Sequence, residues 1–343
     1  MNFSNTLTTW YLVNKRDLPW RNTTNPYHIW LSEIMLQQTR VAQGLPYYIA
    51  FTSVFQTVFD LANASEESVL KLWQGLGYYS RARNLHFTAK YIASELNGVF
   101  PDNYKDLLKL KGIGEYTAAA IASFSYNEAV PVVDGNVFRV LSRYFNIETD
   151  ILSASAKKEF TLLASELISK ENPALFNQAI MEFGALQCVP KSPNCNVCVF
   201  NESCSALQFK KVNLLPVKIK KLKIKNRFLH YLYVFDNKNK TYVNQRLDKG
   251  IWQNLYEFPL IETENTVTDD ELLTLIEEKF ENIKTITFLE NESIIHKLTH
   301  QHLNIKFWKV HLDTIFDNGL DFSDLNKLPF PIVLHNFIKN NRF

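Results

Sequence analysis

All four cysteines of the chain lie within residues 188–204, in the spacing Cys-x6-Cys-x2-Cys-x5-Cys. Four thiolates in one short window indicate a single metal centre, which could hold zinc or an iron–sulfur cluster. Zinc ribbons usually join two Cys-x2-Cys pairs from distant segments, whereas one such pair is flanked here by single cysteines on wide, unequal loops. This spacing favours a [4Fe–4S] cluster, whose predicted ligands are Cys188, Cys195, Cys198 and Cys204.

Two disulfides would be the alternative use of these cysteines, and they would require an oxidising compartment. Met1–Trp10 has neither the basic nor the apolar region of a secretory signal, so we expect no targeting segment. No stretch approaches 18 uninterrupted apolar residues, the minimum for a membrane-spanning helix. The protein is therefore expected to be soluble and cytoplasmic, and nucleoid-associated if it is bacterial.

The length and charge distribution indicate two domains joined by a basic segment. A chain of 343 residues can bury two separate cores. Its formal charge is only +2, yet the segment around Pro216 contains no acid and eight cations: Lys210, Lys211, Lys218, Lys220, Lys221, Lys223, Lys225 and Arg227. Such a run is either a solvated linker or a segment that contacts phosphates.

Hydrophobic periodicity predicts an all-α domain over residues 1–208, a linker over 209–226 and a smaller α+β domain over 227–343. Helical spacing recurs in Ile29–Tyr48, Glu66–Trp73, Arg81–Leu96, Tyr104–Leu110 and Tyr116–Phe124. The second half begins with a predicted hairpin from Phe228 to Val243, turning at Asp236–Lys240. A helix at Asp269–Phe280 and alternating segments at Ile283–Phe288 and His302–His311 follow.

Gly112 and Gly114 form a Gly-x-Gly turn directly before the helix predicted from Tyr116. Glycines allow close approach of the backbone to a ligand, and free amides at a helix N-terminus favour an anion such as a DNA phosphate. Taken alone, the same pattern is equally typical of a plain turn between helices.

The hairpin, the aspartate in Val133–Val140 and the cysteine spacing together resemble the helix-hairpin-helix DNA glycosylase superfamily. Within it, Leu18–Arg21, Trp30–Thr39 and Gly75–Arg83 closely resemble the MutY-type adenine glycosylases. These motifs occur in the family's order over residues 18–204. The resemblance implies a helix-hairpin-helix at about 104–124 and a cluster loop at 188–204.

Glu33 and Asp134 can divide the chemistry of breaking an N-glycosidic bond. This reaction needs a proton donor for the departing base and a carboxylate to stabilise the oxocarbenium-like sugar. Glu33 lies among Trp30, Ile34 and Leu36, an apolar setting that should raise its pKa. The resemblance implies that Glu33 protonates adenine N7 and that Asp134 stabilises the sugar cation. Without it, a buried structural acid and a helix cap would be the simpler interpretations.

Tyr116 occupies the position at which bifunctional relatives such as endonuclease III carry a lysine. A phenol cannot form the Schiff base that leads to strand cleavage. The enzyme is therefore expected to be monofunctional. The predicted catalytic residues are Glu33, Asp134, Tyr116 and Asn136.

A base must leave the duplex before it can be excised, and inserted side chains offset the lost stacking. The resemblance assigns that insertion to Gln38 and Tyr78. It places Trp20, Arg21 and Gln178 in the adenine pocket, and Thr39 and Leu76 near the opposite base.

The second domain resembles the Nudix fold at Gln245–Arg246 and Gly250–Pro259 but lacks the acidic box that binds magnesium. Metal-dependent pyrophosphate hydrolysis is thus not expected. In MutY-type enzymes a Phe-Ser-His loop of this domain reads 8-oxoguanine. The matching residues here are Leu298, Thr299 and His300, a departure at two of three positions that retains a hydroxyl.

The sequence therefore predicts a two-domain, monomeric DNA glycosylase. Its expected partner is double-stranded DNA containing adenine opposite 8-oxoguanine or guanine, and its expected cofactor is a [4Fe–4S] cluster. An endonuclease III-like glycosylase and lyase, a catalytically silent lesion-binding protein and an electron carrier are the alternatives. Tyr116 and the extra domain argue against the first, and the paired carboxylates Glu33 and Asp134 argue against the second. A DNA-binding framework of this size argues against the third.

Overall fold

The computed structural model describes residues 2–219 and 224–341. The predicted linker lysines Lys220, Lys221 and Lys223 lie outside these residues. The chain forms two compact units, one built from residues 1–63 and 87–220 and the other from residues 64–86 and 221–343. Residues 64–86, which the sequence places in the helical domain, thus belong to the same compact unit as the C-terminal residues.

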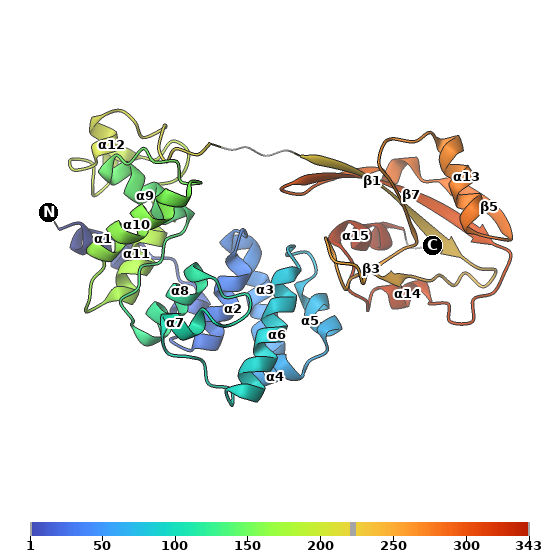
Figure 1. Ribbon diagram of the computed structural model, residues 1–343, viewed down its shortest axis with the longest axis horizontal. Coiled ribbons are helices and arrows are strands. Elements are labelled where there is room, and N and C mark those ends of the chain that lie inside the picture. The colour runs from blue at the N-terminus through green and yellow to red at the C-terminus, as the bar shows by residue number, and fades with distance from the viewer. Residues whose placement is uncertain (1, 220–223, 342–343) are drawn as a thin grey trace. The chain divides into compact units, whose positions relative to one another are not determined.

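The first unit is helical (Figure 1). It contains α1 (Phe3–Asn14), α2 (Pro26–Leu36), α3 (Val41–Val54), α4 (Val58–Asn63), α7 (Tyr104–Leu107), α8 (Glu115–Tyr126), α9 (Gly135–Phe145), α10 (Ala154–Leu167), α11 (Pro173–Leu186) and α12 (Ser205–Gln208). Two 3-10 turns, Pro19–Arg21 and Cys195–Val197, complete it. Helix α11 packs against α1, α8 and α9, around buried Phe160, Phe176 and Leu141.

The prediction of one continuous helix over Ile29–Tyr48 is wrong. Two helices, α2 and α3, replace it, separated by residues 37–40. Gln38 adopts the left-handed backbone conformation with φ of 57°, which an α-helix does not accommodate. The apolar spacing continues across this turn because both helices bury side chains, so periodicity alone does not reveal the break.

The second unit contains a mixed sheet in the order β4-β1-β7-β5, with β6 also paired to β7. Its strands are β1 (Lys225–Phe235), β4 (Leu260–Thr263), β5 (Ile283–Phe288), β6 (Ile294–Lys297) and β7 (Gln301–Leu312). A separate pair joins β2 (Asn244–Gln245) to β3 (Tyr256–Glu257). The other helices are α5 (Glu66–Trp73), α13 (Asp269–Lys279), α14 (Phe322–Leu325) and α15 (Ile332–Asn340), while α6 (Ser80–Glu95) contributes to both units.

Strand β1 is buried on both faces. Leu232 and Val234 pack with α13 on one face. On the other face, Phe307 of the neighbouring strand stacks on Phe337 of α15 with ring centroids 4.1 Å apart. Burial on both sides, together with parallel pairing to β7, explains why the sequence of β1 is a continuous apolar run.

The predicted hairpin from Phe228 to Val243 is reduced to one antiparallel bridge between Phe235 and Thr241. The rest of β1 pairs with β4 and β7 instead, because the chain returns to β1 from segments distant in sequence. By contrast, the structure confirms the predicted helix at Asp269–Phe280 and the strands near Ile283–Phe288 and His302–His311. Among the described residues, no helix has both the length and the apolar character needed to cross a membrane.

Candidate active site

A cavity of about 460 Å³ in the first unit brings many of the predicted site residues together. Its walls come from α2, α8, α9, α11 and the Pro19–Arg21 turn. The predicted residues that line it are Trp20, Arg21, Glu33, Thr39, Tyr116, Asp134, Asn136 and Gln178. Residues far apart in sequence thus converge on one space that is large enough for a nucleobase.

Glu33 is a buried acid in the wall of this cavity. Helix α2 is buried along most of its length, and Glu33 is only 5% exposed. Burial raises the pKa of Glu33 to about 7, and the negative charge of Asp134 acts in the same direction. A hydrogen bond from Tyr116 and the charge of Arg21 lower it and only partly offset these effects. Glu33 is therefore substantially protonated near neutral pH, as a general acid must be.

Asp134 has a different environment, because it is also the N-cap of α9. Its Oδ1 accepts hydrogen bonds from the amides of Asn136 and Val137, both at 2.8 Å, and its Oδ2 accepts one from Asn136 Nδ2 at 2.7 Å. Burial raises the pKa of Asp134 above its ordinary value, and these donors and Arg139 offset that effect only in part. Both interpretations of this residue are compatible, since a capping carboxylate in the cavity wall can also face a substrate.

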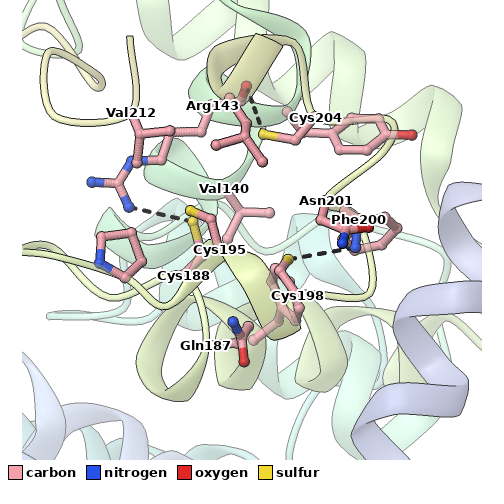
Figure 2. A pocket seen from close by; sticks show the side chains of 14 residues that line it. Val140, Arg143, Gln187, Cys188, Cys195, Cys198, Phe200, Asn201, Cys204 and Val212 are labelled. Atoms are coloured by element: carbon pink, nitrogen blue, oxygen red, sulfur yellow. Dashed lines mark hydrogen bonds between the residues drawn. The ribbon is translucent and has the colours of Figure 1, made fainter. Parts of the chain in front are cut away.

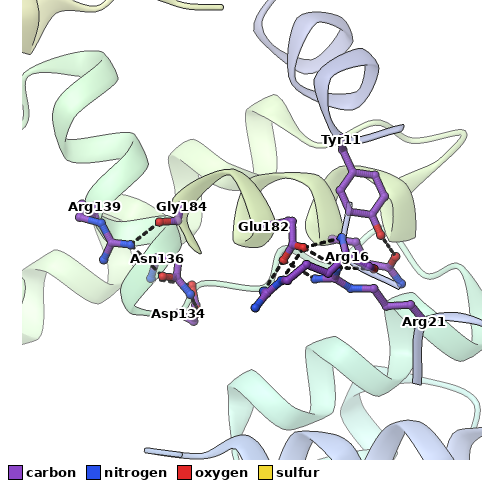
Figure 3. A network of polar contacts seen from close by, with 9 residues as sticks. Tyr11, Arg16, Arg21, Asp134, Asn136, Arg139, Glu182 and Gly184 are labelled. Carbon is purple, nitrogen blue, oxygen red and sulfur yellow. Dashed lines mark hydrogen bonds and ion pairs between the residues drawn. The ribbon is translucent and has the colours of Figure 1, made fainter. Parts of the chain in front are cut away.

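The sequence analysis missed Glu182 of α11, a buried carboxylate that lines the cavity (Figure 3). Five N–H groups donate to it: the amide and guanidinium of Arg16 and the guanidinium of Arg21, at 2.6–3.0 Å. Glu182 is 1% exposed. Burial raises its pKa, but the hydrogen bonds from Arg21 and Arg16 outweigh that effect and lower the pKa to about 2. The signal available in the sequence was its position four residues after Gln178, on the same helix face.

Arg139 of α9 connects the cavity wall to the backbone of the first cysteine, Cys188. Its Nη2 donates to Asn136 Oδ1 at 2.8 Å and to the Gly184 carbonyl at 2.6 Å, and its Nε donates to the Cys188 carbonyl at 2.8 Å. Figure 3 shows the guanidinium between Asn136 and Gly184. Because Asn136 also bonds Asp134, this arginine helps to fix the catalytic candidate in place.

The Gly-x-Gly turn lies between α7 and α8, where the resemblance places a DNA-binding hairpin. Leu110 and Ile113 are buried and anchor it, while Gly112 needs its φ of 79°. Gly114 is the N-cap of α8, and a Cβ added there would meet nothing within 4 Å. The amide end of α8 is therefore open to an approaching anion.

A groove of about 1230 Å³ starts beside this turn. Gln38 and Gly114 line it, together with Glu33, Tyr116 and Asp134. These last three residues border both the groove and the cavity described above. The two carboxylates thus lie where the groove and the cavity share a border.

The second unit holds Tyr78, Thr299 and His300 around another cavity, of about 460 Å³. The hydroxyls of Tyr78 and Thr299 are 2.7 Å apart and share a hydrogen bond. Tyr78 is 48% exposed, and its φ is 48°. Leu76 is only 4% exposed and does not line this cavity.

Arg81 stabilises the loop that presents Tyr78. Its guanidinium lies over the rings of Trp73 and Tyr78, at 5.3 and 5.4 Å from the centroids. It also donates to the carbonyls of Leu76 and Gly77. Tyr78 is therefore exposed on a turn that the contacts of Arg81 hold in place.

The four cysteines surround one space in the first unit (Figure 2). None of the four forms a disulfide, and all are half-buried beside Val140, Tyr144, Phe183 and Phe200. Arg143 Nη1 donates to Cys188 Sγ at 3.4 Å and the amide of Phe200 donates to Cys198 Sγ at 3.4 Å. Burial and the neighbouring thiols raise the pKa of Cys198 to about 11. Within residues 2–219 and 224–341, no three His, Cys, Asp or Glu side chains are arranged to hold a single metal ion.

The chain matches two family profiles. Residues 31–168 match the HhH-GPD superfamily of base excision DNA repair proteins, and residues 230–340 match the NUDIX domain. A structure of a thermostable thymine-DNA glycosylase superposes on 60% of this chain and 95% of its own, with a TM-score of 0.55 and 29% identity. A non-covalent endonuclease III–DNA complex covers the same share of the chain with a TM-score of 0.52 at 22% identity, a likeness of fold.

Relatives found by sequence similarity extend this match. The adenine DNA glycosylase of Buchnera aphidicola subsp. Baizongia pistaciae is 36% identical over 324 residues, covering 92% of this chain and 89% of the relative. The human adenine DNA glycosylase is 43% identical over 215 residues, which are 60% of this chain and 39% of the human protein. The similarity thus includes both the helical and the Nudix-like regions, and the chain belongs to the family of MutY-type adenine DNA glycosylases.

Proposed function

We propose that this DNA glycosylase hydrolyses the N-glycosidic bond of adenine that is paired with 8-oxoguanine or guanine in double-stranded DNA. The observation that carries the proposal is the pair of carboxylates at the mouth of one nucleobase-sized cavity. Glu33 has a pKa of about 7, whereas Asp134 accepts three hydrogen bonds that favour its ionised form. Family membership supports adenine as the base that enters this cavity.

In the proposed mechanism, the carboxyl group of Glu33 gives its proton to N7 of the extruded adenine. The bond between C1′ and N9 then breaks, and its electron pair leaves with the base. Asp134 stabilises the positive charge that develops on the sugar, through its field or a transient ester. Water finally adds to C1′ and releases a proton, leaving an abasic site.

Tyr116 supports a reaction without strand cleavage. It hydrogen-bonds Glu33, and burial first, then the nearby carboxylates, raise its pKa well above the ordinary value. The phenol therefore stays protonated, and it offers no amine for a Schiff base.

The first prediction tests the function directly. Incubating the protein with a duplex that carries adenine opposite 8-oxoguanine should leave the strand intact until alkali is added, because the product is an abasic site. Borohydride should trap no covalent protein–DNA adduct. Breaks without alkali, together with efficient trapping, would instead indicate a lyase of the endonuclease III type.

The second prediction concerns pH. Glu33 must be protonated to act, so kcat/KM for excision should be highest below pH 7 and fall as the pH rises through about 7. Glu33→Gln should lower the single-turnover rate by roughly 10²- to 10⁴-fold while binding of the duplex persists. It should also abolish the descending limb of the pH profile, which is the fall in kcat/KM around pH 7. An unchanged limb in Glu33→Gln would assign the acid role elsewhere.

Thr299 is the proposed reader of the opposite base. 8-Oxoguanine differs from guanine by an acceptor at O8 and a donor at N7, and a hydroxyl can serve either group. Without DNA, the Thr299 hydroxyl is paired with that of Tyr78, the proposed wedge, so both groups lie at the same edge of the cavity. His300 lines the same cavity and is the second candidate for this contact.

The third prediction follows from that contact. Thr299→Val should reduce the preference for adenine opposite 8-oxoguanine over adenine opposite guanine by about 2- to 10-fold, the equivalent of one hydrogen bond. The same change at Thr287, an exposed residue on β5, is the matched control and should leave the ratio unchanged. Single-turnover rates on both duplexes at one salt concentration measure the ratio. Equal ratios in wild type and Thr299→Val would remove Thr299 from lesion recognition.

The cysteine site fits a [4Fe–4S] cluster. Four thiols enclose one space behind apolar walls, and N–H groups of Arg143 and Phe200 donate to two of the sulfurs, as in sites that stabilise bound thiolates. Cys188, Cys195, Cys198 and Cys204 would hold the cluster, which would tie together a loop that contacts DNA. We place it outside the chemistry of excision, because Glu33 and Asp134 lie in a different cavity.

The fourth prediction is the composition of this site. Protein purified without oxygen should contain about four iron and four sulfide per chain and absorb as an iron–sulfur protein. Cys198→Ser should lower the iron content and the affinity for duplex DNA together. Stoichiometric zinc without sulfide in the anaerobic wild type would overturn the assignment.

A further inference from the structure

Tyr11, which was not among the predicted site residues, lies behind the wall of the cavity that Glu33 and Gln178 line. Tyr11 of α1 is 2% exposed and lies in the core between α1 and α11. Its hydroxyl is 2.7 Å from Oε1 of Gln178, which lines the cavity. Tyr11 itself does not line the cavity. It is therefore placed to act on a substrate only through Gln178.

The direction of this hydrogen bond follows from what surrounds the phenol. A buried tyrosine hydroxyl needs an acceptor for its own proton. The carbonyl oxygen of Gln178 supplies one, whereas the opposite orientation of the amide would leave that proton without this partner. Burial, the largest effect, raises the pKa of Tyr11, so the phenol keeps its proton. Tyr11 is the donor and Gln178 Oε1 the acceptor.

Fixing Oε1 also fixes the other end of the amide. Gln178 Nε2 makes no hydrogen bond to another side chain or carbonyl within residues 2–219 and 224–341, and the residue borders the cavity. Its two N–H donors are thus available to a ligand. An amide without Tyr11 could rotate and present its oxygen instead.

Glu182, the neighbouring acid on α11, cannot take the place of the Gln178 amide in binding the base. Glu182 is one turn further along α11, but five N–H donors already occupy its two oxygens. Arg21, which also lines the cavity, is held by the same carboxylate, and its guanidinium lies 5.7 Å from the centre of the Tyr11 ring. Figure 3 shows Tyr11, Arg21 and Glu182 together. The side of the cavity formed by α11 therefore offers donors to the base.

We propose that Tyr11 is a positioning residue that holds the Gln178 amide with its N–H donors toward the cavity, where they bind an acceptor nitrogen of the adenine ring. The inference rests on the proposed function, since it takes adenine as the occupant. Ring nitrogens N1 and N3 are the acceptors that remain once N7 takes the proton from Glu33. Tyr11 contributes by restricting one amide to the orientation that the base requires.

The test is a double-mutant cycle with Tyr11→Phe and Gln178→Ala in the full-length protein. Tyr11→Phe keeps the buried ring and removes only the hydroxyl. It should lower the single-turnover rate on adenine opposite 8-oxoguanine by about 3- to 10-fold. In the Gln178→Ala background, the same change should have no further effect. Additive losses would show that Tyr11 acts independently of Gln178 and would overturn the proposal.

Tyr27→Phe is the matched control. Tyr27 is also buried, and its hydroxyl donates to the Phe55 carbonyl at 2.8 Å, away from the cavity. Both variants should lose a similar, small amount of thermal stability, but only Tyr11→Phe should lose activity. Equal activity losses in the two variants would make the effect a general consequence of destabilisation and contradict the proposal.

Two further readouts separate this inference from the proposed function. Wild type should excise either 1-deazaadenine or 3-deazaadenine more slowly than adenine, and Tyr11→Phe should not slow that analogue further. Independently of activity, ¹⁵N relaxation of the Gln178 side-chain amide should show a rigid group in wild type and Tyr27→Phe and a mobile one in Tyr11→Phe. A protein that fails to excise adenine yet shows this difference would refute the function and retain the positioning role. An amide that is equally mobile in wild type would refute the positioning role.

Discussion

The carboxylate of Glu182 is the interaction on which the cavity depends. It is buried, and it binds both Arg16 and Arg21, so it joins α11 to the segment that follows α1 and to the Pro19–Arg21 turn. Leaving a buried charge without its partner costs roughly 3–5 kcal/mol, which is a large share of the stability of a typical domain. Five converging donors avoid that penalty and hold this part of the cavity wall in one arrangement. Gln178, one turn earlier on α11, takes its position from the same helix.

The two catalytic candidates differ because the fold gives them different polar partners. Glu33 is buried and Asp134 is partly buried, and burial raises the pKa of each. Asp134 stands at the beginning of α9, where free backbone amides and Asn136 compensate its charge. Glu33 lies in the last turn of the buried helix α2, where the backbone amides already donate within the helix, so only Tyr116 and Arg21 oppose the effect of burial. The position of each residue in its helix thus favours a protonated carboxyl group at Glu33 and an ionised one at Asp134, within one cavity.

Local patterns predicted much of this structure, and long-range contacts account for what they missed. The helix predicted over Glu66–Trp73 from its apolar spacing matches the structure to the residue, and in the structure Ser65 caps its N-terminus. The break at Gln38 is invisible in the sequence, since only its φ of 57° interrupts a continuous apolar pattern. The bond between Tyr78 and Thr299 spans 221 positions, and the resemblance, more than any local pattern, singled out both residues. Glu182 escaped notice because a lone acid on a helix is normally solvated.

Arg139 links two segments that the sequence marks by different motifs, the cysteine loop and the segment that contains Asp134. The cysteine spacing and the aspartate motif are distinct patterns, yet one guanidinium donates to the carbonyl of Cys188 and to the side chain of Asn136. Asn136 in turn donates to Asp134. The loop that carries the four thiols and the carboxylate at the cavity therefore share a continuous chain of hydrogen bonds. Folding of the cysteine loop consequently bears on the placement of Asp134, even though none of the four cysteines lines the cavity in which the base is expected to bind.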